Sequence, residues 1–212
     1  MASAMAQRLE GKTIVITGAS SGIGRSTAKE FAKTSPKNLR LIVTARRIDA
    51  LKKLAEEIKT EVGEGVKVLP VKLDVSKPDG RPRQRRSPSP DIAPEDIDTM
   101  FATNVTGLIN MTQEVLKIYK KRPDGGKGDI INIGSIAGHQ GYPGRELIAT
   151  RIRVIGVDPG QVETEFSVVR FYGDKAKADA VYANCEPLTP EDIAELIVFA
   201  AGRRRTWCLL SR

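Results

Sequence analysis

Short apolar runs alternate with amphipathic stretches along the first third of the chain. Runs rich in Ile, Val and Leu predict three strands, at residues 12–18, 39–47 and 66–75. The third strand is weakened by Pro70, which cannot donate a hydrogen bond to a strand ladder. Between the strands, apolar residues recur at helical spacing, most clearly over residues 47–63. This alternation predicts an α/β fold with a doubly wound parallel sheet.

Two further apolar runs, at residues 129–134 and 152–160, predict strands later in the chain. Nearly continuous runs of this kind, bounded by Gly and Pro, favour parallel strands that are covered on both faces. A parallel pair requires a crossover of about a dozen or more residues, usually a helix. The connecting sequence is rich in glycine and has no apolar helical stripe before Glu146. The expected crossover helix is therefore missing, and the predicted sheet is incomplete.

Length and composition bound the class of protein. The chain has 212 residues, 40% of them hydrophobic, which suits one domain over residues 1–212 with a core of its own. Cys185 and Cys208 show neither metal-ligand nor disulfide spacing and favour a reducing compartment. The sequence has no apolar run near the 18 or so residues of a membrane helix and nothing like a signal peptide. We therefore expect a cytoplasmic protein with no membrane partner.

The net charge of +8 is concentrated in two short segments. Four arginines lie in residues 81–86 and four more in residues 203–212, which together equal the whole excess. The rest of the chain is balanced, so the basic composition does not by itself indicate a nucleic-acid partner.

A glycine-rich turn stands between the first strand and the first helix. It reads TGASSGIG, with glycines at Gly18, Gly22 and Gly24. Glycine at these places permits a tight turn and lets the backbone approach a pyrophosphate, whose charge then lies at the helix N-terminus. The strand, turn and helix context predicts a Rossmann-like dinucleotide site that also includes Ser20, Ser21 and Ile23.

The end of the second strand indicates which dinucleotide binds. A site for the unphosphorylated cofactor would have Asp or Glu there, against the ribose hydroxyl. This chain has Arg46 and Arg47 instead, with Arg25 at the start of the helix. Guanidinium groups match a phosphate bidentately, so the sequence predicts NADP as the cofactor. The alternative is that these arginines are ordinary solvated surface residues.

In the glycine-rich turn and the arginines that follow it, the chain resembles the short-chain dehydrogenase/reductase family. The resemblance is carried by five motifs in order along the chain: TGASSGIG, LDV at Asp74 and Val75, TNVTG at Asn104, GSIAG at Ser135, and DPGQVET from Pro159 to Thr164. The segments TARR and DPGQVETEFSVVRF are most similar to the fungal and bacterial NADP-dependent dehydrogenases of serine, allo-threonine and related 3-hydroxy acids.

The resemblance implies a reaction and roles for particular residues. In the family a tyrosine, its pKa lowered by a lysine four residues later, exchanges a proton with the substrate oxygen while a hydride passes to or from the nicotinamide. The resemblance makes Ser135 the hydrogen-bond donor to that oxygen and Asn104 the holder of a proton-relay water. It adds cofactor contacts from the following residues: Asp74, Val75, Pro159, Gly160, Val162 and Thr164. It further implies a small-molecule substrate and, for intact relatives, a homo-oligomer.

Three departures from the family pattern interrupt the resemblance. The tyrosine and lysine are missing: Tyr142 is followed by Pro143 and by Glu146 four residues later, and it matches a loop before the lost helix. The helix and fourth strand that lead to an Asn-Asn-Ala-Gly motif are replaced by an Arg, Pro and Ser-rich linker at residues 76–91, expected to be disordered. A tail at residues 203–212 replaces the last strand that should follow the helix capped by Thr189.

We interpret these departures as products of an altered or mispredicted transcript rather than of an evolved insertion. The sequence then describes an NADP(H)-dependent oxidoreductase of small hydroxy acids, alcohols or carbonyls in a truncated, catalytically impaired form. The alternative is a non-catalytic dehydrogenase-like scaffold that binds protein or nucleic acid through its Arg-rich segment. No aromatic residues stand among these arginines to stack on bases, which disfavours that alternative. His139 is expected to be a loop residue rather than a catalytic base.

Overall fold

The computed structural model of the chain describes residues 4–34, 38–77, 94–123, 126–135, 152–171, 173–183 and 185–203. His139, Tyr142 and nearly all of the predicted linker and tail lie outside the described residues. The chain divides into two compact units. The first unit consists of Met1–Lys72, Ile131–Gly141 and Ile155–Arg212, and the second of Leu73–Ile130 and Tyr142–Val154.

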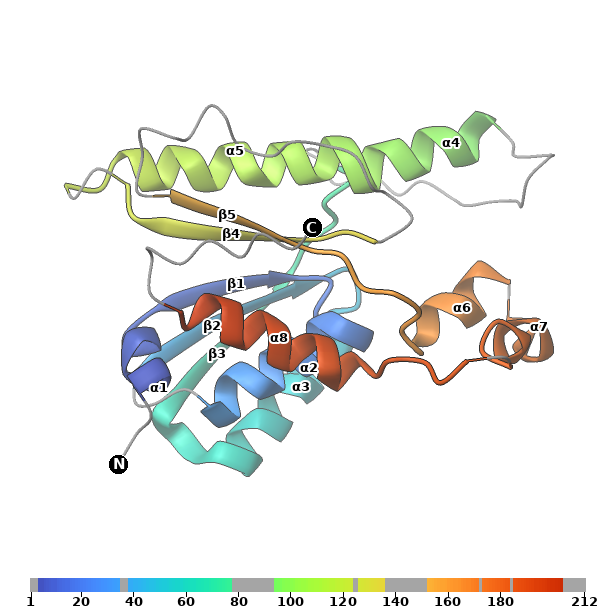
Figure 1. Cartoon of the computed structure of the whole chain (residues 1–212). Helices are drawn as coiled ribbons and strands as arrows, with labels where there is room; N and C mark the ends of the chain where they lie inside the picture. The colour runs from blue at the N-terminus through green and yellow to red at the C-terminus, as the bar shows by residue number, and fades with distance from the viewer. Residues whose placement is uncertain are drawn as a thin grey trace. The chain divides into compact units, whose positions relative to one another are not determined.

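A three-stranded parallel sheet forms the centre of the first unit (Figure 1). It contains β1 (Thr13–Thr17), β2 (Leu39–Ala45) and β3 (Val66–Lys72), with β2 in the middle. The prediction of parallel strands in this region is confirmed. Pro70 lies in β3, which is an edge strand of this sheet because, in the described part of the chain, it pairs with β2 alone. An edge strand is where a proline, which has no N–H group to donate, is tolerated.

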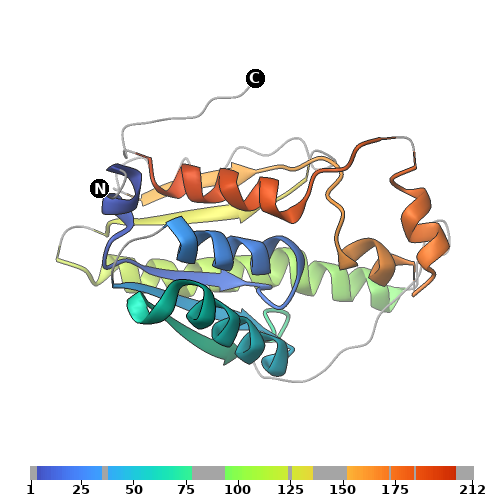
Figure 2. The same ribbon diagram turned by 90° about the horizontal axis from the view of Figure 1, so that it is seen from below.

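Three helices cover one face of this sheet (Figure 2). They are α2 (Gly22–Thr34), α3 (Ile48–Val62) and α8 (Pro190–Ala201), and α2 packs directly against α8. Their apolar faces join the strands in one core, whose largest fully buried side chains include Phe31, Leu41, Leu51, Leu54, Ile58 and Val198. The short helix α1 (Ala4–Leu9) adds Leu9 to this core. The apolar residues that recur at helical spacing in the sequence are thus buried against the sheet.

Two short helices follow the end of β5 in the first unit. They are α6 (Glu165–Arg170) and α7 (Lys175–Ala180), capped by the side chains of Thr164 and Asp174. Ser167 of α6 and Ala178 of α7 are their only buried residues. The segment is joined to the start of α8 by a parallel bridge between Val162 and Leu188. We refer to residues 161–171 as the strap.

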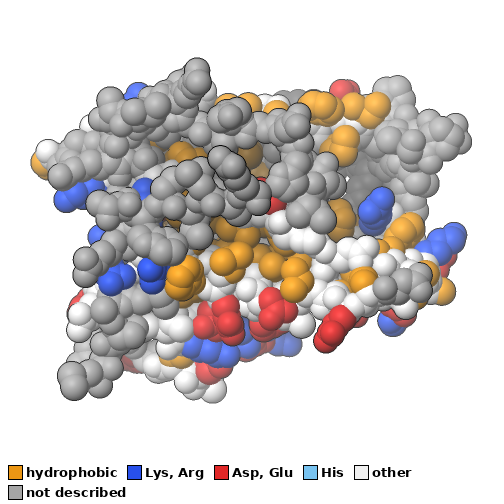
Figure 3. Space-filling view, in the orientation of Figure 1, with side chains coloured by type: hydrophobic (Ala, Val, Ile, Leu, Met, Phe, Trp, Pro, Cys, Tyr) orange, Lys and Arg blue, Asp and Glu red, His pale blue; other side chains and the backbone are white. Residues whose placement is uncertain are grey.

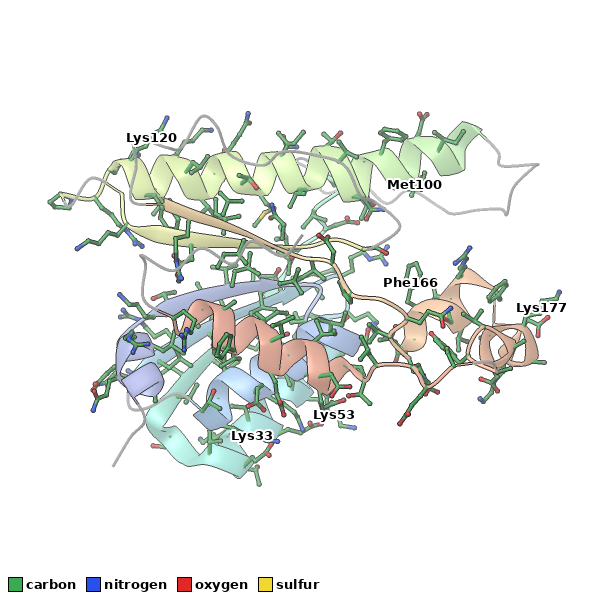
Figure 4. All side chains as sticks on the ribbon, in the orientation of Figure 1. Lys33, Lys53, Met100, Lys120, Phe166 and Lys177 are labelled. Carbon is green, nitrogen blue, oxygen red and sulfur yellow. The ribbon has the colours of Figure 1, made fainter. Side chains whose placement is uncertain are left out.

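A long helical segment occupies the second unit. It consists of α4 (Pro94–Phe101), a π-helical turn over Ala102–Thr106, and α5 (Gly107–Lys120). Many of its large apolar side chains are exposed, including Phe101 at 55% and Ile118 at 59%. Figure 4 labels Met100 and Lys120 near the two ends of this segment. None of the helices that the described residues form is long and apolar enough to cross a membrane.

The remaining strands are β4 (Gly128–Ile133) and β5 (Ile152–Val157), which pair in a separate two-stranded sheet. Figure 1 shows them running in the same direction, as the sequence predicts. Val157 is buried, most of their other described residues are half-buried, and Ile133 is 44% exposed, so cover on both faces stays a prediction. The sequence between them supplies no apolar helical stripe that could cover the second face.

Candidate cofactor site and active-site residues

The glycine-rich turn leaves β1 and enters α2 in the first unit, as the sequence predicts. Gly18 and Gly22 adopt positive φ angles of 69° and 52°, which side chains rarely tolerate. Ala19, fully buried, donates its backbone N–H to the carbonyl oxygen of Thr44 at 3.1 Å. This hydrogen bond ties the turn to the end of β2, where the predicted phosphate-binding arginines begin.

Gly24 marks the closest backbone approach in the turn. A Cβ atom at this position would lie 2.6 Å from the carbonyl oxygen of Gly18 and 3.2 Å from the Cα of Ala19. The backbone can therefore fold this tightly only without a side chain. A tight glycine turn that ends in a helix N-terminus is the arrangement that accepts a pyrophosphate.

Arg47 lies across the same turn. Its Nε donates to the Oγ of Ser20 at 3.3 Å, and its Nη2 donates to the Oγ of Ser21 at 2.7 Å. Nη2 also forms an ion pair with the Oε2 of Glu165, 3.0 Å away on the strap. A carboxylate therefore occupies the neighbourhood in which a phosphate group would meet this guanidinium. Arg47 and both serines were predicted from sequence, whereas Glu165 was not.

The other two predicted arginines have different surroundings. Arg25 projects from α2 to Glu57 on α3 and forms a hydrogen-bonded ion pair with it. Lys29 binds the same carboxylate at 3.0 Å. The hydrogen bond from Lys29, reinforced by the nearby Arg25 charge, lowers the pKa of Glu57 despite opposition from partial burial. Arg46 is exposed beside Arg47 at the end of β2. In the part of the chain that the structure describes, the side chain of Arg47 is hydrogen-bonded to the glycine-rich turn, whereas Arg25 reaches it through its backbone N–H, which donates to the carbonyl oxygen of Ser21 at 3.3 Å.

Ser135 lies just beyond β4, next to the end of β5. The N–H of Gly134 donates to the carbonyl oxygen of Val157 at 2.8 Å. A Cβ atom on Gly134 would stand 2.2 Å from the Oδ1 of Asp158, so this glycine allows the two strand ends to meet. Ser135 is exposed, one residue from this contact, and Pro159 and Gly160 follow Asp158 directly. The structure thus brings Ser135 close to the DPG motif.

Val162 and Thr164 fix the strap in place. The carbonyl oxygen of Val162 accepts from the hydroxyl of Tyr182 at 3.1 Å, and this hydroxyl also lies 2.5 Å from the Oγ of Ser167. Thr164 caps α6 by accepting from the N–H of Phe166 at 3.2 Å. Its methyl group would lie 3.3 Å from a Cβ on Gly22, so the strap contacts the glycine-rich turn.

Asp74, Val75 and Asn104 belong to the second unit. Asp74 accepts from the hydroxyl of Ser76 at 2.6 Å and pairs with Lys77 at 3.5 Å, which fixes the chain direction just after β3. A Cβ on Gly107 would stand 2.6 Å from the carbonyl oxygen of Val75. Asn104 is exposed within the π-helical turn, a feature the sequence pattern did not predict. Such turns often occur at functional sites.

The sequence matches the short chain dehydrogenase family over residues 12–83 and 80–147. The chain belongs to this family. The match covers the glycine-rich turn, Asn104 and Ser135, and confirms the resemblance inferred from the motifs.

Individual relatives of this short-chain dehydrogenase agree with the assignment. The chain is 45% identical to an NADP-dependent 3-hydroxy acid dehydrogenase of Schizosaccharomyces pombe, over 93% of this chain and 89% of the relative. It is 30% identical to a serine 3-dehydrogenase of Agrobacterium fabrum, over 90% and 88%. The closed form of a serine dehydrogenase complexed with NADP+ matches with a TM-score of 0.73 and 30% identity, covering 92% of this chain and 90% of that one.

None of the four tyrosines of this short-chain dehydrogenase has a lysine four residues later in the sequence. Position 123 after Tyr119 is proline, position 146 after Tyr142 is glutamate, position 176 after Tyr172 is alanine, and position 186 after Tyr182 is glutamate. Within the described residues, the turn has the arrangement that accepts a pyrophosphate, and the exposed hydroxyl of Ser135 can donate a hydrogen bond. Neither Ser135 nor Asn104 exchanges a proton readily near neutral pH.

Proposed function

We propose that this chain carries the cofactor site of an NADP(H)-dependent oxidoreductase acting on small hydroxy acids, in a form whose catalysis is impaired. The observation that carries the proposal is the place of Arg47, at the end of β2 and hydrogen-bonded to Ser20 and Ser21 of the glycine-rich turn. A basic residue there favours a 2′-phosphate, whereas an acidic one favours a free ribose hydroxyl. The relatives named for NADP-dependent hydroxy acid and serine dehydrogenation support the same cofactor and substrate class.

In the oxidation of a hydroxy acid, the carbinol carbon loses a hydride and its hydroxyl loses a proton, which leaves a keto acid. The nicotinamide, when bound, accepts the hydride. Ser135 donates a hydrogen bond to the substrate oxygen, and Asn104 holds the water that relays the proton. The family's proton acceptor is a tyrosine with a lysine four residues on, and this chain has no such pair. Loss of positioned acid-base catalysis typically costs about 10² to 10⁴-fold in rate.

The length of the alignment with a relative supports truncation as the cause of the impaired catalysis. The alignment with the Schizosaccharomyces pombe relative extends over 238 positions, yet it includes only 93% of a 212-residue chain. Because 93% of 212 residues is fewer than 238, some aligned positions of the relative have no counterpart in this chain and stand opposite gaps. The gaps are expected where the fourth strand and the helix with the tyrosine and lysine stand in the family.

The proposal includes a cytoplasmic location, a small-molecule substrate and no nucleic-acid partner. Cys185 is a free, exposed thiol, which suits a reducing compartment. The Arg-rich segment at 81–86, on which the alternative scaffold function depends, lies outside the described residues. No structural observation therefore favours that second function.

The test compares the affinities of the chain for NADPH and NADH. We expect NADPH to bind more tightly, and we expect Arg47→Ala to weaken NADPH by about 10 to 100-fold, the range for a hydrogen bond to a charged group, while NADH changes little. Lys52→Ala, which removes an exposed positive charge from the neighbouring α3, is the matched control and should leave both affinities unchanged. Fluorescence titration of the bound nicotinamide measures each constant. Equal affinity of the unmodified chain for the two cofactors would contradict the proposal.

A further inference from the structure

Glu165 is paired with Arg47, the residue to which the proposed function assigns the 2′-phosphate. Its Oε2 lies 3.0 Å from Nη2 of Arg47, while the same Nη2 donates to Ser21 at 2.7 Å. Nη2 carries two N–H groups, so these two acceptors account for both of them. The residues that meet here come from three separate segments of the first unit: the glycine-rich turn, the end of β2 and the strap.

The geometry of the guanidinium makes Glu165 and a phosphate compete for the same N–H groups of Arg47. A phosphate can be bound bidentately along the edge formed by Nε and Nη2 or along the edge formed by Nη1 and Nη2. Both edges include Nη2. A 2′-phosphate can therefore take a bidentate position on Arg47 only if Ser21 or Glu165 leaves Nη2, and the like charge of Glu165 makes it the group that the phosphate displaces. The negative charge of Glu165 also repels the phosphate for as long as the carboxylate stays nearby.

We propose that Glu165 is a specificity-determining residue that acts as an internal substitute for the 2′-phosphate, and that the phosphate of the incoming cofactor displaces it and releases α6. The inference rests on the proposed NADP site. It goes beyond that site because it couples recognition of the phosphate to the strap. An unphosphorylated dinucleotide leaves the pair of Arg47 and Glu165 intact.

Helix α6, at the end of the strap, buries little of its own surface. Helix α6 has six residues, and Ser167 is the only one that is buried. Phe166 is 70% exposed, and Figure 4 shows its side chain pointing away from the helix. Short elements with few buried contacts open at low free-energy cost. Ser167 is held by Tyr182, so the exposed ion pair of Glu165 is one of several contacts of α6 and the one that links this helix to Arg47.

Thr164 connects the displacement of Glu165 to the rest of the site. It caps α6 through Phe166 and also packs its methyl group near Gly22 in the glycine-rich turn. When Glu165 turns away from Arg47, the Thr164 contact becomes the pivot about which α6 moves. The strap therefore opens at its α6 end and stays anchored at its start, where the N–H of Glu163 donates to the carbonyl oxygen of Leu188 at 2.9 Å.

The first measurement uses calorimetric titration of the full chain with adenosine 2′,5′-bisphosphate and with 5′-AMP. Glu165→Gln should tighten the bisphosphate by about two to fivefold, as expected for removal of one exposed competing ion pair, and leave 5′-AMP unchanged. Glu163→Gln removes the same charge two residues earlier without touching Arg47, and should change neither ligand. Unchanged or weaker binding of the bisphosphate to Glu165→Gln would overturn the inference.

The second measurement follows amide hydrogen exchange of α6 in the unmodified chain, which requires no variant. Saturation with the bisphosphate should speed exchange in α6, and saturation with 5′-AMP should not. Slower or unchanged exchange with the bisphosphate would overturn the inference. If the unmodified chain binds no bisphosphate at all, the proposed function fails as well; if it binds the bisphosphate but Glu165→Gln has no effect, only the coupling through Glu165 fails.

Discussion

Single residues determine the geometry of the cofactor turn. Gly24 has no room for a methyl group beside the carbonyl of Gly18, and Arg47 aligns with the two serines because Ala19 ties the turn to the end of β2. The glycines and the arginine were recognisable in the sequence because each is a local requirement of the strand, turn and helix. Glu165 was not, because it lies 118 residues from Arg47 and carries no motif of its own.

The first residue-scale prediction concerns Gly24→Ala. The added methyl group would meet backbone atoms that cannot move without opening the turn, so we expect overpacking to cost about 1 to 3 kcal/mol and NADPH binding to be lost. Gly65→Ala is the matched control, because a Cβ there meets nothing within 4 Å. Chemical denaturation and NADPH titration of both variants provide the comparison. Unimpaired NADPH binding by Gly24→Ala would show that the turn is not the cofactor site.

Ion pairs between helices illustrate what the sequence could not predict at this scale. Arg25 was predicted to face the cofactor, yet it lies against Glu57, together with Lys29. Figure 3 shows acidic and basic side chains side by side over this part of the surface. The pairing depends on how α2 and α3 align after both have packed on the sheet. Such alignment is a tertiary property, so residue spacing within one helix does not reveal it.

At the scale of elements, periodicity predicted the strands and helices of the first unit well. The runs that predict β2 and the helix α3 bury their apolar sides as expected, whereas Val15 of β1 and Leu69 of β3 are exposed. The π-helical turn around Asn104 was missed, because one widened turn does not disturb the apolar pattern on either side of it.

Helix α8 provides the element-scale prediction through its capping box. The Oδ2 of Asp192 accepts from the N–H of Thr189 at 2.8 Å, and this hydrogen bond lowers the pKa of Asp192 below its ordinary value of 3.8. The ionised form is therefore favoured by folding. Its stabilisation is complete above the ordinary pKa and is lost as the pH falls through the lowered one.

We therefore expect Asp192→Asn to reduce amide-exchange protection at the start of α8 at neutral pH and to remove the decline in protection that the unmodified chain shows in acid. Thr189→Ala should cost about 0.5 to 2 kcal/mol by removing the cap itself. Glu195→Gln, an exposed change on the same helix, is the control for loss of charge alone. An acid decline that persists in Asp192→Asn would show that the cap does not cause it.

At the scale of the whole molecule, the described residues expose many large apolar side chains. They include Val15 at 45%, Leu69 at 57%, Phe101 at 55% and Phe166 at 70%. Each buried Leu, Val or Ile forgone costs roughly 1.5 to 3 kcal/mol, whereas a domain is stable by only about 5 to 15 kcal/mol. Under the proposed truncation, the folded state of the chain has little stability margin left.

We predict that the purified 212-residue chain binds the dye ANS at neutral pH and melts over a broad temperature range. The physical reason is apolar surface that the missing elements cover in the family. Calorimetry and ANS fluorescence, each measured with and without NADPH, provide the test, because a ligand that binds only the folded state sharpens and raises the transition. A sharp cooperative melt without ANS binding would mean that the core is complete.

The measurement that most directly tests the central claim is the rate of NADPH oxidation or NADP reduction by this chain. The chain is assayed with serine, 3-hydroxy acids and the corresponding carbonyls, beside the Schizosaccharomyces pombe relative at equal saturation with cofactor. We expect NADPH binding with turnover reduced by about 10² to 10⁴-fold, since the sequence retains Arg47 and Ser135 but has no tyrosine with a lysine four residues later. Turnover equal to that of the relative, abolished by Tyr142→Phe, would show that catalysis is intact and that this tyrosine transfers the proton.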